Sequence, residues 1–425
     1  MPLANNLQTA TEFLDESKAG FIVEPVTLAR MPSWTLADGA LSHVSGGFFS
    51  VIGAEFDPSS DRSRQALFLY QPQSAINGLL TCVREGRRHF LLQARAEPGN
   101  LGGAQYGPTL QSTPANYLRM HGGKASPYLE FFTRLRPDLR VLHDSVQLDL
   151  GGRYLFKSKR VIVVECPADV PVEDGFIWVA PDVITESVAC STFLNTDLRA
   201  LLAVWAWEFE GGEGELSPAC RHVAASMRLP PRAPVLGRVM ESLGAGIAAY
   251  RLVDLARLQD WRITDRGIVG QAAQCGIDVG YFHVEARRRE VSSWQQPLIV
   301  SRTSGHARLV CRLMDGVLEV LVTVEAEAGL QTGKAVLPSQ LRYPGAAPAD
   351  SEPCGRVLLQ TTESDEGGRF YRNASTCELV LAEPGYESAG VWLRVSELKW
   401  LLARSNVCAI QLRCLASFLL GELAL

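Results

Sequence analysis

A polar segment from Glu97 to Arg119 holds a dense group of side chains that could bind a small molecule. Its amides and hydroxyls both donate and accept hydrogen bonds, and its glycines and prolines predict a loop. Loops on a rigid sheet are common binding sites, although the same amides could simply satisfy backbone groups in a well-packed turn. The candidate substrate-binding residues in and beside this segment are Arg95, Asn100, Gln105, Thr109, Gln111, Asn116 and Arg119.

A second motif, Gly151-Gly152-Arg153-Tyr154, has the residue types that hold a phosphate group. Glycine lets a ligand approach the backbone closely, and the planar fork of an arginine can grip a diphosphate. Asn195 and Arg199 lie four residues apart, so on a helix they share one face. Taken alone, each arginine is better explained by a salt bridge at the surface or between domains. The candidates from these segments are Gln147, Gly152, Arg153, Asn195 and Arg199.

The motifs recur in the second half of the chain, which indicates an internal duplication. The matched pairs are Trp34 with Trp261, Gln71-Pro72 with Gln296-Pro297, Glu97 with Glu327, Gly152-Arg153 with Gly368-Arg369, Trp178 with Trp392, and Arg199 with Arg413. The pairs keep one order and their separations drift slowly, whereas chance matches would scatter. The repeat adds Gly368, Arg369, Trp392 and Arg413 to the candidates. Trp34 is a candidate for stacking a base, although a tryptophan in a strand is more often part of the core.

Each copy follows one predicted plan. An alternating run, 78–96 in the first copy and 307–326 in the second, predicts a hairpin that turns at Glu85-Gly86 or Asp315-Gly316. A further strand and a closing helix follow, the helix at 197–210 in the first copy and at 396–404 with 411–420 in the second. Strands followed by helices predict an α+β fold of two tandem modules, each with mixed β-sheets flanked by helices. The expected units are an N-terminal arm (1–33), module 1 (34–228), a linker and connecting helix (229–260, with the helix at 235–258) and module 2 (261–425).

The composition excludes several classes of protein. A formal net charge of −5 argues against nucleic acid or an anionic membrane as the main partner. Ten cysteines standing singly predict free thiols in a reducing, cytoplasmic protein. Residues 1–19 lack the pattern of a signal peptide, and no apolar run is long enough for a membrane span. Phosphate-loop, dinucleotide-fold, zinc-protease and serine-hydrolase motifs are absent, and no metal site is predicted.

Two longer runs carry a resemblance to a known family: Gln-Ala-Arg-Ala-Glu-Pro-Gly-Asn at 93–100 and Gly-Pro-Thr-Leu-Gln-Ser-Thr-Pro-Ala-Asn-Tyr at 107–117. With the two Gly-Gly-Arg-aromatic motifs and the terminal Arg-x-Leu pattern, they resemble the NDP-4-keto-6-deoxyhexose 2,3-dehydratases over nearly the whole chain. The resemblance implies two modules shaped like nudix hydrolases, a homodimer, and activity without metal or organic cofactor. The nudix box of grouped glutamates is missing, so the implied shape comes without pyrophosphatase chemistry.

The substrate implied by the resemblance is a dTDP-4-keto-6-deoxyglucose-type sugar nucleotide, used in deoxysugar and antibiotic biosynthesis. Its C4 carbonyl acidifies the C3 hydrogen, so a general base can remove that proton while donors stabilise the enolate oxygen. The C2 hydroxyl then leaves, and the enol tautomerises to a 3,4-diketo-2,6-dideoxy sugar that a partner 3-ketoreductase would reduce. The candidates for the base, which the spacing does not rank, are Tyr106, Tyr117, Glu97 and Asp149.

The two copies differ where the chemistry is expected. The first has Glu-Pro-Gly-Asn at 97–100 and Asn195, whereas the second has Glu-Ala-Gly-Leu at 327–330 and Ala409. We therefore expect the first copy to supply most of the active site, and the second to be structural or to hold a degraded nucleotide site.

The chain also departs from the family pattern beside the first Gly-Gly-Arg motif. It has Gln147-Leu148-Asp149 in place of Gln-Ser-Glu, and Phe156–Arg160 in place of an Arg-Asn-Arg run. If those side chains touch the substrate, the sugar or nucleotide would differ. The departures support one alternative, a catalytically inactive sugar-nucleotide-binding protein of the same fold. A nucleotide-diphosphate hydrolase would need the missing carboxylates for Mg²⁺, and PLP-assisted deoxygenation would need a Schiff-base lysine, for which no motif exists.

Overall fold

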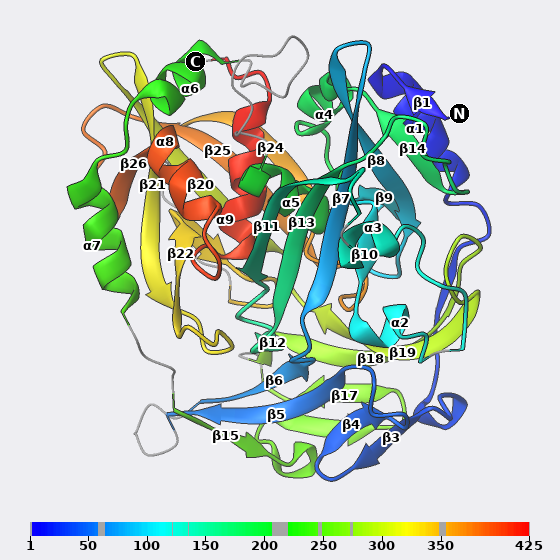
Figure 1. The fold of residues 1–425 in the computed structure, drawn as a ribbon. Helices are drawn as coiled ribbons and strands as arrows, with labels where there is room; N and C mark the ends of the chain where they lie inside the picture. The colour runs from blue at the N-terminus through cyan, green and yellow to red at the C-terminus, as the bar shows by residue number, and fades with distance from the viewer. Residues whose placement is uncertain are drawn as a thin grey trace.

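The computed structural model describes residues 2–57, 64–120, 122–134, 136–205, 220–244, 249–272, 275–347 and 354–424. They form an α+β fold in which helices flank four β-sheets (Figure 1). Strands pair both parallel and antiparallel, so the predicted class of mixed sheets flanked by helices is confirmed.

Each half of the chain builds one large sheet. The N-terminal sheet has the order β1-β14-β8-β7-β13-β11, with β9 beside β8 and β10 beside β7. Its strands are β1 (Leu3–Ala4), β7 (Ala75–Arg84), β8 (Arg87–Ala96), β9 (Ala104–Gly107), β10 (Leu110–Ser112), β11 (Arg140–Leu148), β13 (Ser158–Glu165) and β14 (Phe176–Val179). The C-terminal sheet has the order β22-β21-β20-β25-β24, with β23 beside β20 and β26 beside β21. Its strands are β20 (Gly305–Met314), β21 (Val317–Ala326), β22 (Lys334–Pro338), β23 (Gln340–Arg342), β24 (Gly355–Ser364), β25 (Ala374–Ala382) and β26 (Val391–Arg394).

The hairpins at the centre of both sheets turn where the sequence predicts. Glu85 and Gly86 have φ of 51° and 76°, and Asp315 and Gly316 have φ of 51° and 80°. Two consecutive residues in the left-handed region match the right-handed twist of the flanking strands, which explains the Glu-Gly and Asp-Gly pairs.

Two smaller sheets lie together below the large ones in Figure 1, and they exchange strands between the halves. The first consists of β3 (Trp34–Ala37), β4 (Ala40–His43), β5 (Ser50–Phe56), β6 (Arg64–Tyr70), β12 (Tyr154–Leu155) and β15 (Tyr250–Val253). The second consists of β2 (Ile22–Pro25), β16 (Trp261–Thr264), β17 (Gly267–Gly270), β18 (Ile277–Glu285) and β19 (Ser293–Ser301). Strand β2 of the N-terminal arm pairs with β18, and β15 of the linker pairs with β5. Each half is therefore completed by a strand from the other.

Helices fill the space between the two large sheets, where α5 packs against α9 (Figure 1). One apolar cluster joins both sheets to both helices, with Leu79, Leu309, Leu201 and Leu415 as examples. Full burial of one such leucine contributes about 1.5–3 kcal/mol, so this shared core holds the halves together. The helices are α1 (Leu7–Glu16), α2 (Pro114–Tyr117), α3 (Glu130–Thr133), α4 (Pro181–Ser187), α5 (Thr196–Trp205), α6 (Arg221–Arg228), α7 (Ala233–Leu243), α8 (Val395–Leu402) and α9 (Ile410–Ala416), with 3-10 turns η1 (Leu28–Arg30), η2 (Leu255–Arg257) and η4 (Ser417–Leu420).

Three local expectations need correction. The helix expected at 235–258 ends with α7 at Leu243, because the chain beyond it returns as β15 to pair with β5. The segment expected to be a loop at 97–119 contains β9, β10 and α2. Of the helix expected at 197–210, α5 ends at Trp205 and 206–210 lie outside the described residues.

The pairing of Gln71 with Gln296 is also wrong. The backbone N–H of Leu69 donates to Arg153 O, and that of Ile299 donates to Arg369 O, so Leu69 and Ile299 occupy matching positions. Gln71 therefore matches Ser301, whereas Gln296 lies inside β19.

Candidate active site

A cavity of about 410 Å³ opens between the two halves. Its wall combines β7, β8, β10, α2, β13 and the start of α5 with the hairpin 33–49 of the N-terminal half and the segments 289–296 and 366–369 of the C-terminal half. The volume is that of pockets that enclose small organic ligands. Neither half alone could form this site.

The floor of the cavity is a buried network of charges. Lys159 Nζ donates to Asp197 Oδ1 at 2.7 Å and lies 3.2 Å from Asp149 Oδ2. Lys157 Nζ lies 3.2 Å from the same Asp149 oxygen and 3.8 Å from Glu366 Oε2. Asp149 thus lies behind two lysines that both face the cavity, and it holds them in place. Lys157 directly precedes β13 and Lys159 is the second residue of that strand, and both side chains line the cavity.

Burial and charge pairing set the protonation of this network. Burial raises the pKa of the Asp197 carboxyl, against the opposing effect of Lys159. Burial lowers the pKa of Lys157 more than Asp149 and Glu366 raise it. Burial also acts against the charge on Lys159, but Asp149 and Asp197 outweigh it and hold the Lys159 pKa above its usual value. At the floor, Lys159 is therefore held in its charged form, whereas burial disfavours the charges of Asp197 and Lys157.

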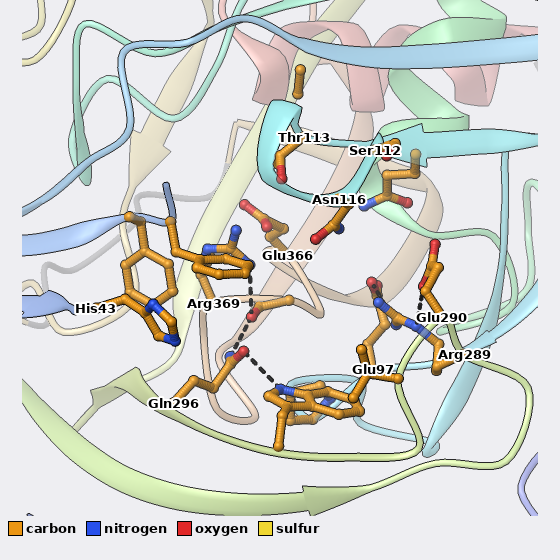
Figure 2. A pocket seen from close by; sticks show the side chains of 18 of the residues that line it. His43, Glu97, Ser112, Thr113, Asn116, Arg289, Glu290, Gln296, Glu366 and Arg369 are labelled. Atoms are coloured by element: carbon orange, nitrogen blue, oxygen red, sulfur yellow. Dashed lines mark hydrogen bonds and ion pairs between the residues drawn. The ribbon is translucent and has the colours of Figure 1, made fainter. Parts of the chain in front are cut away.

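A second charged group lines the cavity away from His43, where Figure 2 shows Glu97, Arg289 and Glu290 together. Glu97 Oε1 lies 2.9 Å from Arg95 Nη2 and 3.4 Å from Arg289 Nη1. Burial alone would raise the pKa of both glutamates, but the two arginines outweigh it. Arg95 and Arg289 lower the pKa of Glu97, and Arg289 and Arg95 lower the pKa of Glu290. These carboxylates are held ionised, which suits them to fixing arginines rather than to taking protons.

Aromatic rings form another side of the cavity. The ring centroids of Trp34 and Phe49 are 4.9 Å apart, and those of Trp34 and His43 are 5.5 Å apart. The Arg369 guanidinium lies over Phe49, with Cζ 4.4 Å from the ring centroid. Figure 2 shows Arg369 between His43 and Glu366, so an arginine separates the aromatic side from the charged floor. Gln296 fixes this arrangement because its amide donates to Gly368 O at 2.7 Å.

Backbone contacts between the halves position the segment 366–369. Gly99 N donates to Gly367 O at 2.8 Å, and reciprocally Gly329 N donates to Gly151 O at 2.9 Å. Both contacts require glycine, because a Cβ at Gly99 would collide with Phe370 O and one at Gly329 with Tyr154 O. The Glu-x-Gly loop of each half therefore docks on the Gly-Gly-Arg loop of the other.

The cavity brings together part of the set predicted from the sequence. The predicted residues that line it are Trp34, Arg95, Glu97, Gln111, Asn116, Gly368 and Arg369. Asn195 and Asp149 support this wall without lining it. The Asn195 amide donates to Gln111 Oε1 at 3.0 Å, and its carbonyl oxygen accepts from Leu198 N at the start of α5.

Both predicted catalytic tyrosines lie away from the cavity. Tyr106 is fully buried and donates to Ala10 O at 2.6 Å, and burial raises its pKa far above the usual value. Tyr117 packs beside the apolar cluster around Phe132. Neither lines the cavity, since the strand β9 and the helix α2 turn these rings toward the core.

Other predicted residues bind the protein itself. Thr109 donates to Leu91 O, Asn100 to Arg95 O and Gln105 to Ser364. Arg119 is exposed and donates to Gly123 O. Three of these four side chains therefore satisfy backbone carbonyl groups, which is the alternative that the sequence left open.

The remaining predicted residues join the two halves. Gln147 donates to Leu402 O and Arg404 O, Arg413 to Leu148 O, Arg153 to Pro344 O, and Arg199 pairs with Glu363 at 2.9 Å. Gly152 packs against the Tyr343 ring, whereas Trp392 contacts Arg312 within the C-terminal half. These three arginines therefore make contacts between the halves, as the alternative explanation from the sequence proposed.

Several lining residues were missed. No motif pointed to Asn77 or Asp197, which come from separate elements, or to Arg289 and Glu290 from the other half. Lys157 and Lys159 stood out only as a departure from the family pattern. The acidic residue before the second Gly-Gly-Arg motif, Glu366, was the one signal that motif comparison could have found.

The matching position in the C-terminal half is almost filled. By strand register, Asn77, Lys159 and Gln111 correspond to Ala307, Ser375 and Leu341. The cavity there is about 30 Å³, and Tyr343 stands beside it with its ring under Arg153. Such a space admits a water molecule or two.

Three further observations concern the described residues. All ten cysteines are free, as predicted. Across the described ranges, no group of His, Cys, Asp and Glu side chains is arranged to hold a metal ion. None of the helices in those ranges has the length and hydrophobicity needed to span a bilayer.

Comparison with known proteins adds independent findings. A family model described as NDP-hexose 2,3-dehydratase matches residues 8–205 and 241–419. The dTDP-4-dehydro-6-deoxy-alpha-D-glucopyranose 2,3-dehydratase of Streptomyces violaceoruber is 32% identical over 361 residues, which cover 81% of this chain and 80% of that protein. Proteins of the same description from Saccharopolyspora spinosa and Amycolatopsis orientalis are 28% and 29% identical, over 94% and 93% of this chain and 88% and 86% of theirs.

Proposed function

This chain belongs to the NDP-hexose 2,3-dehydratase family, and we propose that it dehydrates dTDP-4-keto-6-deoxyglucose at C2 and C3. The observation that carries the proposal is the cavity between the halves, which is lined by ionisable groups and an arginine. The family model matches residues in both halves that form this cavity. The product is the 3,4-diketo-2,6-dideoxy sugar nucleotide.

The arrangement of the cavity supports one mode of binding. The aromatic side, with Trp34 and His43, suits the thymine base. Arg369 suits the diphosphate, since its guanidinium already lies on Phe49 and, in the described part of the chain, its Nε has no hydrogen-bond partner. The sugar then lies toward the charged floor, with the keto group near the lysines.

The floor has the groups that a dehydration needs. The C4 carbonyl of the substrate makes the C3 proton acidic, so the protein has to supply a proton acceptor and a cation near the enolate oxygen. Lys157 and Lys159 provide positive charge in a buried site, where it acts more strongly than in water. The substrate carbonyl serves as the electron sink, and we expect the reaction to need no metal or organic cofactor.

Further properties belong to this proposal. The two halves are copies of one nudix-like module, which the matching strand orders support. The active molecule is a cytoplasmic homodimer. Its product is consumed by a 3-ketoreductase, since a 3,4-diketo sugar is reactive, and the pathway leads to a deoxysugar of an antibiotic or related product.

Mass spectrometry tests the function directly. Purified protein is incubated with dTDP-4-keto-6-deoxyglucose, EDTA, and a 3-ketoreductase with NADPH to trap the product. Loss of one water followed by gain of two hydrogens is expected. Unchanged substrate that nonetheless raises the melting temperature would indicate an inactive binding protein, and release of dTMP would indicate a hydrolase.

A further inference from the structure

Among the described residues, four carboxylates and one imidazole line the cavity, and three of these five groups are poorly suited to accept a proton. Glu97 and Glu290 are paired with arginines that lower their pKa. His43 lies among the aromatic rings, where it bonds Ser45. The carboxylates of Asp197 and Glu366, both beside the buried lysines, remain.

The two remaining carboxylates differ in their unused oxygen atoms. Glu366 Oε2 accepts the Tyr154 hydroxyl at 2.5 Å and faces Lys157. Asp197 Oδ1 accepts Lys159 Nζ, whereas its Oδ2, buried in the cavity wall, has no hydrogen-bond partner within the described residues. A buried oxygen without a partner is rare and calls for a functional explanation.

Resting on the function proposed above, we propose that Asp197 is the catalytic residue that carries the proton from C3 to the departing C2 oxygen, and that Lys159 is a positioning residue. Oδ2 takes the C3 proton as the C3–H bond breaks, and the electron pair forms an enolate with its charge on the C4 oxygen. The C2–O bond then breaks as the pair forms the C2–C3 double bond. Asp197 returns its proton to the leaving oxygen, so water departs and the carboxylate is restored.

The stereochemistry of the substrate allows one carboxyl to do both steps. In a glucose-configured ring, the hydrogen on C3 and the oxygen on C2 lie on the same face. A carboxylate beneath that face reaches both without moving. Lys159 fixes the other oxygen of Asp197, and Asn195 holds the first turn of α5, on which Asp197 lies.

The surroundings of Asp197 make it a stronger base than an exposed aspartate. Burial raises its pKa, and Asp149 and Glu366 add to this, against Lys159. Arg95 from β8, and Arg413 and Cys414 from α9, are the other titratable groups that interact with it electrostatically. A pKa closer to the working pH increases the efficiency of proton transfer in both directions.

The decisive experiment separates proton abstraction from loss of the hydroxyl. The probe is the 2-deoxy analogue of the substrate, which can enolise but has nothing to eliminate. In D₂O, wild-type protein should exchange the C3 hydrogen, which mass spectrometry detects. Asp197→Asn should lose this exchange, and should lose dehydration of the true substrate by about 100-fold or more, while still binding it in a thermal-shift assay. Asp182→Asn is the matched control, because Asp182 is in the first turn of α4 on the surface.

Each outcome decides between the two claims. Wild-type protein that leaves the true substrate unchanged would overturn the proposed function and this assignment together. Active wild type with an Asp197→Asn variant that retains exchange would overturn the assignment alone. Exchange that is lost in Glu366→Gln but kept in Asp197→Asn would transfer the role to Glu366.

The positioning role of Lys159 predicts a change in pH dependence. Activity needs ionised Asp197, so kcat/KM falls as the pH falls through its pKa. Lys159→Met removes the nearest positive charge, which raises that pKa further and moves the acidic limb to higher pH. Lys159→Arg keeps the charge and should leave the limb near its wild-type position. A purely structural role would lower activity at every pH, so an unmoved limb in folded Lys159→Met would overturn the positioning role.

Discussion

Replacing Gly99 with alanine should disturb the site through the contact between the halves. The new Cβ would lie 2.9 Å from Glu366 O and 3.0 Å from Gly367 O, and closer still to Phe370 O. Backbone oxygens cannot rotate away, so the two loops must separate and the hydrogen bond from Gly99 N to Gly367 O is lost. The lost bond costs about 1 kcal/mol and the overpacking about 1–3 kcal/mol.

The total, about 2–4 kcal/mol, predicts a measurable change in melting temperature. An unfolding entropy of roughly 2.1 cal/mol/K per residue gives a chain of 425 residues about 0.9 kcal/mol/K, so Tm should fall by about 2–4 °C. The displaced loop carries Glu366 and Arg369, and a shift of about 1 Å in such groups lowers kcat/KM by roughly 100-fold. The trapped-product assay and a thermal melt measure the two effects.

Gly102→Ala is the control within the same loop. Its Cβ would lie 3.7 Å from Thr192 Oγ1 and 3.9 Å from Ala104 O, which is ordinary contact, so Tm and kcat/KM should stay close to wild type. If Gly99→Ala melts and reacts like Gly102→Ala, the docking of the loops does not constrain the site. A lower Tm with unchanged kcat/KM would mean that the contact holds the fold but does not position the cavity.

Three further changes test the charged groups. Tyr154→Phe removes the hydroxyl that donates to Glu366. Because Glu366 lies at the end of the cavity proposed for the sugar, kcat should fall by about tenfold with little change in KM, and a wild-type kcat would refute this role. Arg369→Lys should raise KM by about tenfold at similar kcat in steady-state assays, since lysine loses the fork and the contact with Phe49. Burial raises the pKa of Glu327 to about 7 from 4.5, so the folded protein holds this proton more tightly and stability falls as pH rises between those values. Glu327→Gln should therefore raise the free energy of unfolding by up to about 3 kcal/mol at about pH 8, with a higher Tm, and change both little at about pH 5. A Tm difference that stays constant across pH would contradict the pKa shift.

The elements of the fold were predictable where local signals sufficed. The Glu85-Gly86 and Asp315-Gly316 turns fixed the central hairpins, because few residue pairs tolerate left-handed conformations. The exchanged strand β15 was not predictable, since Tyr250–Val253 pairs with β5, which lies far away in the sequence. A strand of four residues directly after a helix is too short to show the alternation of hydrophobic and polar residues that identifies a strand.

The site was harder to predict because its residues come from both halves. Trp34, Arg95 and Arg369 were found from motifs, yet Lys159 and Asp197 belong to elements whose sequences read as an ordinary strand and helix. Their meeting depends on the packing of α5 against the sheet, which sequence spacing does not specify. Motif residues such as Arg153 show the converse, since the same arginine fork that can grip phosphate here binds a carbonyl oxygen of the other half.

The contrast between the two halves separates what the fold needs from what the chemistry needs. Both halves keep the glycine of the reciprocal loop contact, because a Cβ at either position would collide with a backbone oxygen of the other half. At the floor of the larger cavity, Lys159 and Asp197 stand where the small cavity has the uncharged Ser375 and Gln411. Since one cavity is about 410 Å³ and its counterpart about 30 Å³, the second position cannot enclose a sugar nucleotide. Substitution of Gly329 should consequently act mainly on stability, whereas substitution of Asp197 acts on the reaction itself.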